Sequence, residues 1–223
     1  MIPLKDDVRS DTFPFVTILI IALNAAVFVY QLALGLAGGE AFIYRAAAIP
    51  YEVTHLVDIG PRSFVPLPLT LFTAMFVHGG LFHLGGNMIF LWIFGDNIED
   101  RFGHILFALF YLASGVAASL SHILISPSGI TPMIGASGAI AAVLGAYFIF
   151  FPRAQVKTLV FLVFFVTTVR VPAVLFLGFW FLMQVTSSGF GGEAVAWYAH
   201  IGGFVVGAAV GLVLKLASPS GRH

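Results

Sequence analysis

Long hydrophobic runs, separated by short groups of charged, proline or glycine residues, divide this chain into six segments. The runs cover residues 13–36, 80–98, 102–125, 137–151, 171–186 and 196–216. A helix rises about 1.5 Å per residue, so roughly 20 apolar residues cross a hydrocarbon core of about 30 Å. The pattern therefore predicts an all-α, multi-pass membrane protein whose six spans form a single domain over residues 1–223.

The connections between the runs carry their own signals. The first connection, 38–68, holds six charged or histidine residues and four prolines, and it is too long for an idle connector. We expect it to be a structured loop that lies partly in the membrane interface. Residues 1–12 form a short polar head. Residues 156–168 are expected to re-enter the membrane or to lie along its cytoplasmic surface.

Composition narrows the class of protein. Hydrophobic residues make up 60% of the chain and charged residues only 9%, whereas a soluble domain carries roughly a quarter charged residues. Ten basic and ten acidic residues leave no net charge, so nothing favours a nucleic-acid partner. The chain has no cysteine, which excludes disulfides and thiol nucleophiles. The first run is longer than a signal-peptide core, so we expect an uncleaved first span. We also expect an integral protein of the plasma (cell inner) membrane.

The distribution of basic residues predicts the orientation. With both termini in the cytoplasm, the cytoplasmic side receives eight basic residues: Lys5, Arg9, Arg101, Arg153, Lys157, Arg170, Lys215 and Arg222. Only Arg45 and Arg62 lie outside, which agrees with the excess of positive charge on cytoplasmic loops of membrane proteins. The spans 80–98, 137–151 and 196–216 therefore begin at the outer face.

Each of these three spans carries unusual polar residues near its outer end. His83 and Asn87 lie four residues apart on one helix face, Ser137 begins the fourth span, and His200 lies near the start of the sixth. Counting about 1.5 Å per residue from the cytoplasmic ends places Ser137, His200 and His83 about 10 Å below the outer surface. Polar groups at one depth in three helices indicate a functional site.

The residue types fit nucleophilic catalysis. Ser137 stands between Gly135 and Gly138 at a helix start, where unpaired N–H groups suit a developing oxyanion. A neutral histidine is the usual base for a serine, and His200 is the better candidate. The reason is that Gly203 and Gly207 let its helix approach the small residues of the fourth span.

His83 and Asn87 are then the expected oxyanion donors, together with the Ser137 backbone N–H. No acidic residue lies at this depth, and Glu193 falls in the preceding loop, so the residues predict a dyad.

Other readings of the same residues exist. A single intramembrane histidine also bridges helices by hydrogen bonding, and glycine rows also serve ordinary helix packing. His78 and His83 form a conceivable metal pair, but the His-Glu-x-x-His pattern of metalloproteases is absent. We therefore expect neither a metal nor another cofactor.

Three motifs together resemble the rhomboid family of intramembrane serine proteases. They are HGGLFHLGGN at 78–87, GASG at 135–138, and AHIGG at 199–203 followed by Gly207. The resemblance implies a six-helix rhomboid core, with Ser137 as nucleophile, His200 as base, and His83 and Asn87 lining the oxyanion hole. Two departures are that Pro68, Leu69 and Thr70 stand where many members have Trp-Arg, and that Ala141 replaces a common tyrosine.

The sequence thus predicts an intramembrane serine endopeptidase that cuts transmembrane substrates near the outer membrane face, surrounded by membrane lipid. The alternative is a non-catalytic rhomboid-like protein that binds transmembrane helices. A small channel or transporter would predict inverted repeats and broken helix pairs, and neither is evident in the sequence. No sequence signal bears on the oligomeric state.

Overall fold

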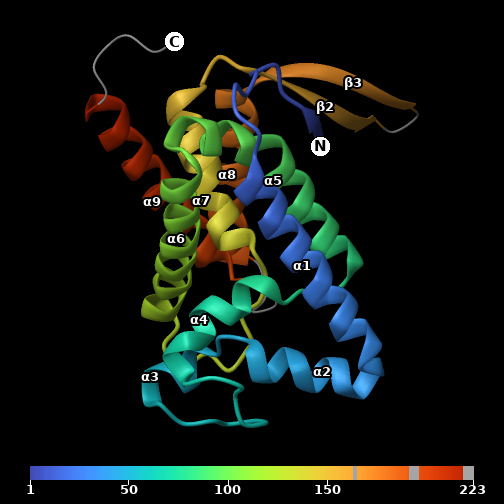
Figure 1. The fold of residues 1–223 in the computed structure, drawn as a ribbon, viewed down its shortest axis with the longest axis vertical. Helices are drawn as coiled ribbons and strands as arrows, with labels where there is room; N and C mark the ends of the chain where they lie inside the picture. Colours follow the sequence, from blue (N-terminus) through green and yellow to red (C-terminus); the bar gives the residue numbers. More distant parts are fainter. Residues whose placement is uncertain (163–164, 191–195, 218–223) are drawn as a thin grey trace.

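The computed structural model describes residues 1–162, 165–190 and 196–217, and most of them are helical (Figure 1). The helices are α1 (Phe15–Ala33), α2 (Gly35–Ala46), α3 (Pro50–His55), α4 (Thr70–Thr73), α5 (Leu81–Phe102), α6 (His104–Ile125), α7 (Ser137–Phe150), α8 (Ala173–Phe190) and α9 (Trp197–Ala217). Short 3₁₀ turns, η1 (Leu67–Leu69) and η2 (Ala74–Phe76), flank α4. The strands are β1 (Ile2–Lys5), β2 (Gln155–Leu162) and β3 (Phe165–Pro172).

Helix α7 occupies the centre of the bundle. Every residue from 139 to 147 is buried, and α7 packs against α5, α6, α8 and α9 (Figure 1). A helix that is apolar on all sides has no face suited to water, so it is stable only when other elements surround it. The first residue of this central helix is Ser137.

Three of the described helices, α1, α6 and α9, are long and apolar enough to cross a membrane. A fourth span results if residues 67–76 and α5 count as one bent pair, whose halves meet at 82°. No broken helix pair was evident from the sequence, and this bent pair is either a broken span or a re-entrant segment. The bend lies at Val77–Gly80, where His78 precedes two glycines that end one helical segment before the next begins.

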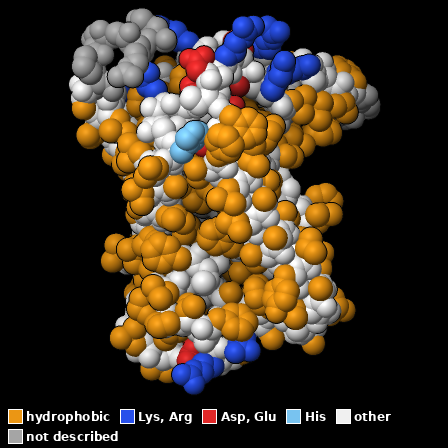
Figure 2. Space-filling view, in the orientation of Figure 1, with side chains coloured by type: hydrophobic (Ala, Val, Ile, Leu, Met, Phe, Trp, Pro, Cys, Tyr) orange, Lys and Arg blue, Asp and Glu red, His pale blue; other side chains and the backbone are white. Residues whose placement is uncertain are grey.

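The surface agrees with a membrane setting. Figure 2 shows hydrophobic side chains over the middle of one face, with Lys, Arg, Asp and Glu gathered at its two ends. Apolar side chains as large as Leu109 on α6 and Val213 on α9 are more than half exposed. A continuous apolar band of this kind is unfavourable in water and favourable in lipid, so the chain is an integral membrane protein.

The fold is not all-α, because β1, β2 and β3 form an antiparallel sheet in that order. Residues 156–168 were expected to re-enter the membrane or lie along its surface, but their described part, 156–162 and 165–168, lies in the paired strands β2 and β3. The head contributes β1. Valine, threonine and phenylalanine dominate 156–171 and favour strands. The helix predicted at 171–186 is α8, which begins at Ala173, after β3, and reaches Phe190.

The long first connection is structured and supports the segment before Ser137. Its helices α2 and α3 lie at the end of the bundle opposite the sheet (Figure 1). Ala48 and Met133 exchange two backbone hydrogen bonds, of 3.1 and 2.9 Å, and Gly135 N–H donates to the carbonyl of Ala74 at 2.9 Å. These bonds fix the backbone that leads into α7.

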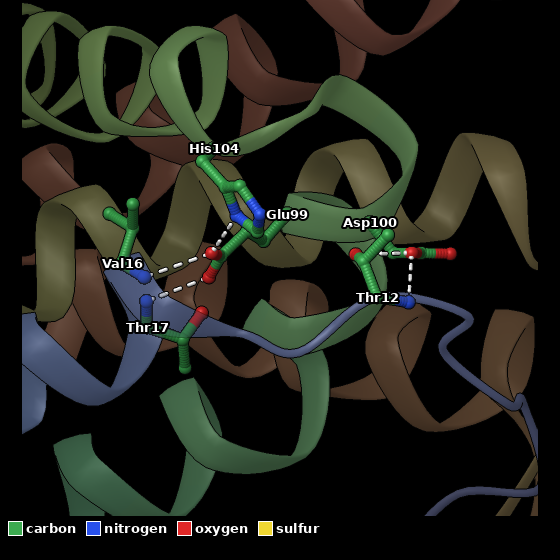
Figure 3. Close-up of polar contacts among 6 residues, drawn as sticks. All are labelled: Thr12, Val16, Thr17, Glu99, Asp100 and His104. Carbon is green, nitrogen blue, oxygen red and sulfur yellow. Dashed lines mark hydrogen bonds and ion pairs between the residues drawn. The ribbon is translucent and has the colours of Figure 1, made fainter.

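A buried carboxylate joins the start of α1 to the end of α5 (Figure 3). Glu99 is fully buried, and its two oxygens accept the backbone N–H groups of Val16 and Thr17 at 2.9 and 2.7 Å. His104 Nδ1 lies 2.6 Å from the same carboxylate. Pro14 precedes α1 without a side-chain cap, so Glu99 satisfies orphan donors of α1 from another helix.

Candidate active site

Ser137 and His200 meet across the interface between α7 and α9. The Oγ atom of Ser137 lies 2.7 Å from Nε2 of His200, within hydrogen-bonding distance, although 63 residues separate the two in the chain. Both side chains are half-buried, and both line the same cavity.

Glycine residues of α9, which have no side chain, allow α7 and α9 to pack with their backbones in close contact. A Cβ atom added to Gly203 would lie 2.2 Å from the carbonyl oxygen of Gly138, and one added to Gly207 would lie 1.9 Å from that of Ala142. No real Cβ atom tolerates such contacts, so these glycines set the spacing of the helices. The spacing brings the His200 ring within reach of Ser137.

The other ring nitrogen of His200 has a partner on α8. Its Nδ1 lies 2.8 Å from Oε1 of Gln184, which is 8% exposed. The amide nitrogen of Gln184 donates to the carbonyl of Trp180 at 3.1 Å, and a carbonyl only accepts. Oε1 must therefore face His200, and Nδ1 must carry the proton. In neutral imidazole this leaves Nε2 as the acceptor for the Ser137 hydroxyl.

Two tryptophans enclose the imidazole of His200. The Trp180 ring lies 6.1 Å away at a tilt of 39°, and the Trp197 ring lies at the same distance edge-on. These aromatic neighbours come from α8 and α9. Ala141, one turn after the serine, is buried instead against the backbone of α9 near Gly203.

Two further donors converge on Gly135, two residues before the serine. Gly135 has φ of +109°, a conformation that side chains other than hydrogen rarely adopt. A Cβ atom there would lie 2.7 Å from Nε2 of His83 and 3.5 Å from Nδ2 of Asn87. The glycine thus serves the backbone turn and also leaves room for both α5 side chains.

The groups of α5 are set up to donate hydrogen bonds. The N–H of Gly79 donates to Nδ1 of His83 at 3.4 Å, so the ring proton of neutral His83 is on Nε2, the atom that faces Gly135. Nδ2 of Asn87 is buried and has no partner among the described residues. The Ser137 N–H precedes the first intrahelical bond of α7, from Ile140 N–H to Ala136.

One cavity of about 540 Å³ connects these groups. Ser137, His200, His83, Asn87 and Gln184 all line it, together with His122 of α6. In the part of the chain that the structure describes, no group of three or more His, Cys, Asp or Glu residues is arranged to hold a metal ion. Glu193 lies outside the described residues. The site therefore offers a paired serine and histidine beside several N–H donors.

Comparison with known proteins identifies the family. The family model described as "Rhomboid domain" matches residues 68–216, which include all of these groups. The chain belongs to the rhomboid family. Similar proteins include "Rhomboid protein 1, mitochondrial" of Saccharomyces cerevisiae, 30% identical over 173 residues, which are 73% of this chain and 46% of that protein.

Two further rhomboids show the range of relatives. "Rhomboid protease GluP" of Bacillus subtilis is 36% identical over 143 residues, which are 64% of this chain and 26% of the relative. "RHOMBOID-like protein 6, mitochondrial" of Arabidopsis thaliana is 32% identical over 154 residues, which are 68% of this chain and 45% of the relative. The chain spans less than half the length of each of these proteins.

The structure brings four residues named from the sequence, Ser137, His200, His83 and Asn87, to one cavity that further residues also line. Gln184 and Trp180 were not singled out from the sequence, yet both line the cavity, and so does His122, which was expected to be a loop, interface or tail residue. A signal for Gln184 did exist, because it is an uncharged polar residue inside an apolar run, and polar side chains within a span indicate function. Its partner could not be named without knowing how α8 packs against α9.

Proposed function

We propose that this rhomboid is an intramembrane serine endopeptidase that hydrolyses peptide bonds of transmembrane substrates. One observation carries the proposal: His200 Nε2 lies 2.7 Å from Ser137 Oγ, while Gln184 occupies Nδ1. This arrangement gives the histidine the tautomer that a general base requires.

In the first step Ser137 Oγ attacks the carbonyl carbon of the scissile bond. Its proton moves to Nε2 of His200 as the new C–O bond forms, and the carbonyl oxygen becomes an oxyanion. Oε1 of Gln184 accepts the Nδ1 proton throughout and keeps the ring in place. The imidazolium then gives its Nε2 proton to the leaving amine nitrogen, the C–N bond breaks, and an acyl-serine remains.

The oxyanion forms beside three donors. These are the Ser137 N–H at the start of α7, Nε2–H of His83 and the unpaired Nδ2 of Asn87. Donors held in position before the reaction stabilise the transition state more than the ground state. The positive end of the α7 dipole acts in the same direction.

Water completes the cycle. His200 Nε2 removes a proton from a water molecule as its oxygen attacks the acyl carbon, and the same histidine then protonates Ser137 Oγ as the ester bond breaks. The cavity of about 540 Å³ has room for water beside the serine. Every proton is accounted for by one serine, one histidine and water.

The membrane arrangement of this proposal has six spans with both termini in the cytoplasm. Its support is the eight-to-two distribution of basic residues and the apolar surface of Figure 2. Helix α7 has 14 residues and is about 21 Å long, shorter than the hydrocarbon core, so Ser137 starts below the outer surface. The plasma membrane stays a prediction, since the relatives include mitochondrial proteins and one of a bacterium.

A fluorophosphonate probe tests the proposal directly. The probe phosphonylates an activated serine with loss of fluoride, so it should label the purified protein and fail to label Ser137→Ala. Ser119→Ala, which removes another cavity serine, is the matched control and should keep full labelling. Equal labelling of wild type and Ser137→Ala would reject the assignment of the nucleophile. If wild type bound transmembrane helices but did not react with the probe, the non-catalytic alternative would be supported.

A further inference from the structure

Three basic side chains form a row across the sheet at the end of the bundle. Lys157 in the central strand is the register partner of Lys5 on one side and of Arg170 on the other. Residues directly opposite on neighbouring strands share a face, with Cβ atoms about 5 Å apart, and like charges in such positions repel. An anion that lies against the row would relieve this repulsion.

The protein itself supplies no such anion in the described residues. Within residues 1–162, 165–190 and 196–217, no carboxylate lies within 4 Å of the charged nitrogens of these three side chains. The nearest acidic residues in sequence are used elsewhere, because Asp6 accepts hydrogen bonds from Tyr147 and Asn97. Asp7 accepts the N–H of Gln155 at 2.7 Å. Both carboxylates therefore lie near the row, but among the described residues neither forms an ion pair with one of its three cations.

Beyond this row the hairpin is apolar and exposed. The sequence carries no charged residue from 158 to 169. Phe161, Phe165 and Val166 are 59, 61 and 58% exposed, and Figure 1 shows β2 and β3 reaching sideways from the bundle. Exposed apolar side chains of this size are unfavourable in water, so this part of the hairpin is suited to an apolar medium.

The distances fit a membrane surface. Four residues separate Lys157 from Phe161, or about 13 Å along a strand at about 3.3 Å per residue. The polar layer between the lipid phosphates and the hydrocarbon core is on the order of 5–8 Å deep. Because the hairpin extends sideways from the bundle (Figure 1), a tilt that turns about half of this length into depth would place the cations at the phosphates and the hairpin end at the acyl chains.

We propose that the sheet is a docking surface for anionic phospholipid headgroups of the leaflet at this end of the bundle. Phosphate oxygens lie against Lys5, Lys157 and Arg170, and Phe161, Phe165 and Val166 enter the acyl chains. An anionic lipid surface satisfies both features at once, because it offers a layer of negative charge directly above hydrocarbon. The proposal concerns the sheet alone and holds whether or not Ser137 is catalytic.

Spin labelling tests it cleanly because the chain has no cysteine. A nitroxide on Val166→Cys is measured in nanodiscs that contain phosphatidylglycerol and in others of phosphatidylcholine alone. Its collisions with oxygen and with a water-soluble nickel chelate report its depth. Leu109→Cys on the exposed side of α6 and Asp11→Cys in the polar head give the lipid and water references.

The expected result is that label 166 matches the Leu109 reference in anionic nanodiscs and becomes accessible to nickel in neutral ones. Lys157→Gln with Arg170→Gln should abolish the response to lipid charge. Arg9→Gln with Arg153→Gln removes two exposed charges at the same end and should leave it intact. Thermal unfolding of each variant verifies the fold. Anionic lipid should raise the unfolding temperature of wild type but not that of Lys157→Gln with Arg170→Gln.

Three outcomes would overturn the proposal. The first is a label at 166 that stays open to nickel in every lipid. The second is equal insertion in neutral lipid or after loss of Lys157 and Arg170, which would show that the cation row binds no headgroups. The third is protection in lipid-free detergent that rises with protein concentration, which would make a second copy of the chain the occupant.

Discussion

The imidazole of His200 and the amide of Gln184 are joined by a contact of 2.8 Å between Nδ1 and Oε1. The contact links α9 to α8 and decides which nitrogen of the neutral imidazole carries the proton. Gln184 does not touch Ser137, so its proposed role is to position His200.

Replacing Gln184 with methionine, which keeps the length and removes the acceptor, should lower kcat about fivefold with little change in KM. The reason is the loss of one neutral hydrogen bond, worth about 1 kcal/mol, which holds the ring and its tautomer. Gln184→Glu retains an acceptor and should recover most of the rate. Cleavage kinetics of a single-span reporter substrate and the rate of fluorophosphonate labelling measure the effect. If Gln184→Met and Gln184→Glu lost the same activity, packing rather than hydrogen bonding would explain the loss.

His200 and the α5 donors should give different kinetic losses. His200→Ala removes the base and should lower turnover by at least about 10³-fold. His83→Ala and Asn87→Ala each remove one oxyanion donor and should cost about 10²–10³-fold in kcat. Reporter cleavage in liposomes measures all three. An active His200→Ala beside an inactive His83→Ala would reverse the two roles.

The contact between α7 and α9 should tolerate no added methyl group. In Gly203→Ala the new Cβ would lie 2.2 Å from the Gly138 carbonyl, so the helices must separate. Since an error of about 1 Å can cost 10²-fold in rate, we expect a loss of that order in reporter cleavage. Gly178→Ala on α8, with nothing within 4 Å of its added Cβ, is the matched control and should keep full activity. Unchanged activity in Gly203→Ala would mean that the spacing is not critical.

The buried carboxylate of Glu99 should contribute strongly to stability. Glu99→Ala leaves the N–H groups of Val16 and Thr17 without their acceptor and should destabilise the protein by about 1–3 kcal/mol. Asp100→Ala removes a similar but more exposed contact with Thr12 and should cost less than about 1 kcal/mol. Thermal unfolding in detergent compares the two, and equal shifts would argue against the importance of burial.

The polar head should make stability depend on pH. Burial raises the pKa of the Asp6 carboxyl from 3.8 to about 6, with further increases from the charges of Asp96 and Asp7, against a lowering effect of the Tyr147 hydrogen bond. A carboxyl that holds its proton more tightly in the folded state stabilises the fold fully below its unfolded pKa. That contribution is lost as the pH rises through about 6.

Asp6→Asn tests this dependence. The amide oxygen can still accept from Tyr147 and Asn97, but it never ionises. The variant should be more stable than wild type at about pH 8 and should show a smaller difference between about pH 5 and pH 8. Thermal unfolding at both pH values measures the effect. An identical pH dependence in the two proteins would place the titration elsewhere.

Much of this molecule is determined by local sequence. Hydrophobic runs of helical length lie where α1, α5, α6, α7 and α9 form, because the apolar pattern and helix-breaking residues are properties of neighbours in the chain. His83 and Asn87 share a face of α5 for the same reason, since residues four apart always do in a helix. The three short motifs were enough to indicate the rhomboid family.

Other features were decided by packing between distant parts of the chain. The apolar sequence of residues 156–168 is compatible with a strand or with a membrane-associated segment. In the structure β2 pairs with β1, which lies more than 150 residues earlier in the chain. Gln184 reaches His200 only because α8 lies beside α9, and Glu99 caps α1 from another helix. The hydrophobic periodicity of a segment can be read from adjacent residues. The partner of a side chain across the bundle depends instead on the distance between two helices, which glycines such as Gly203 set here.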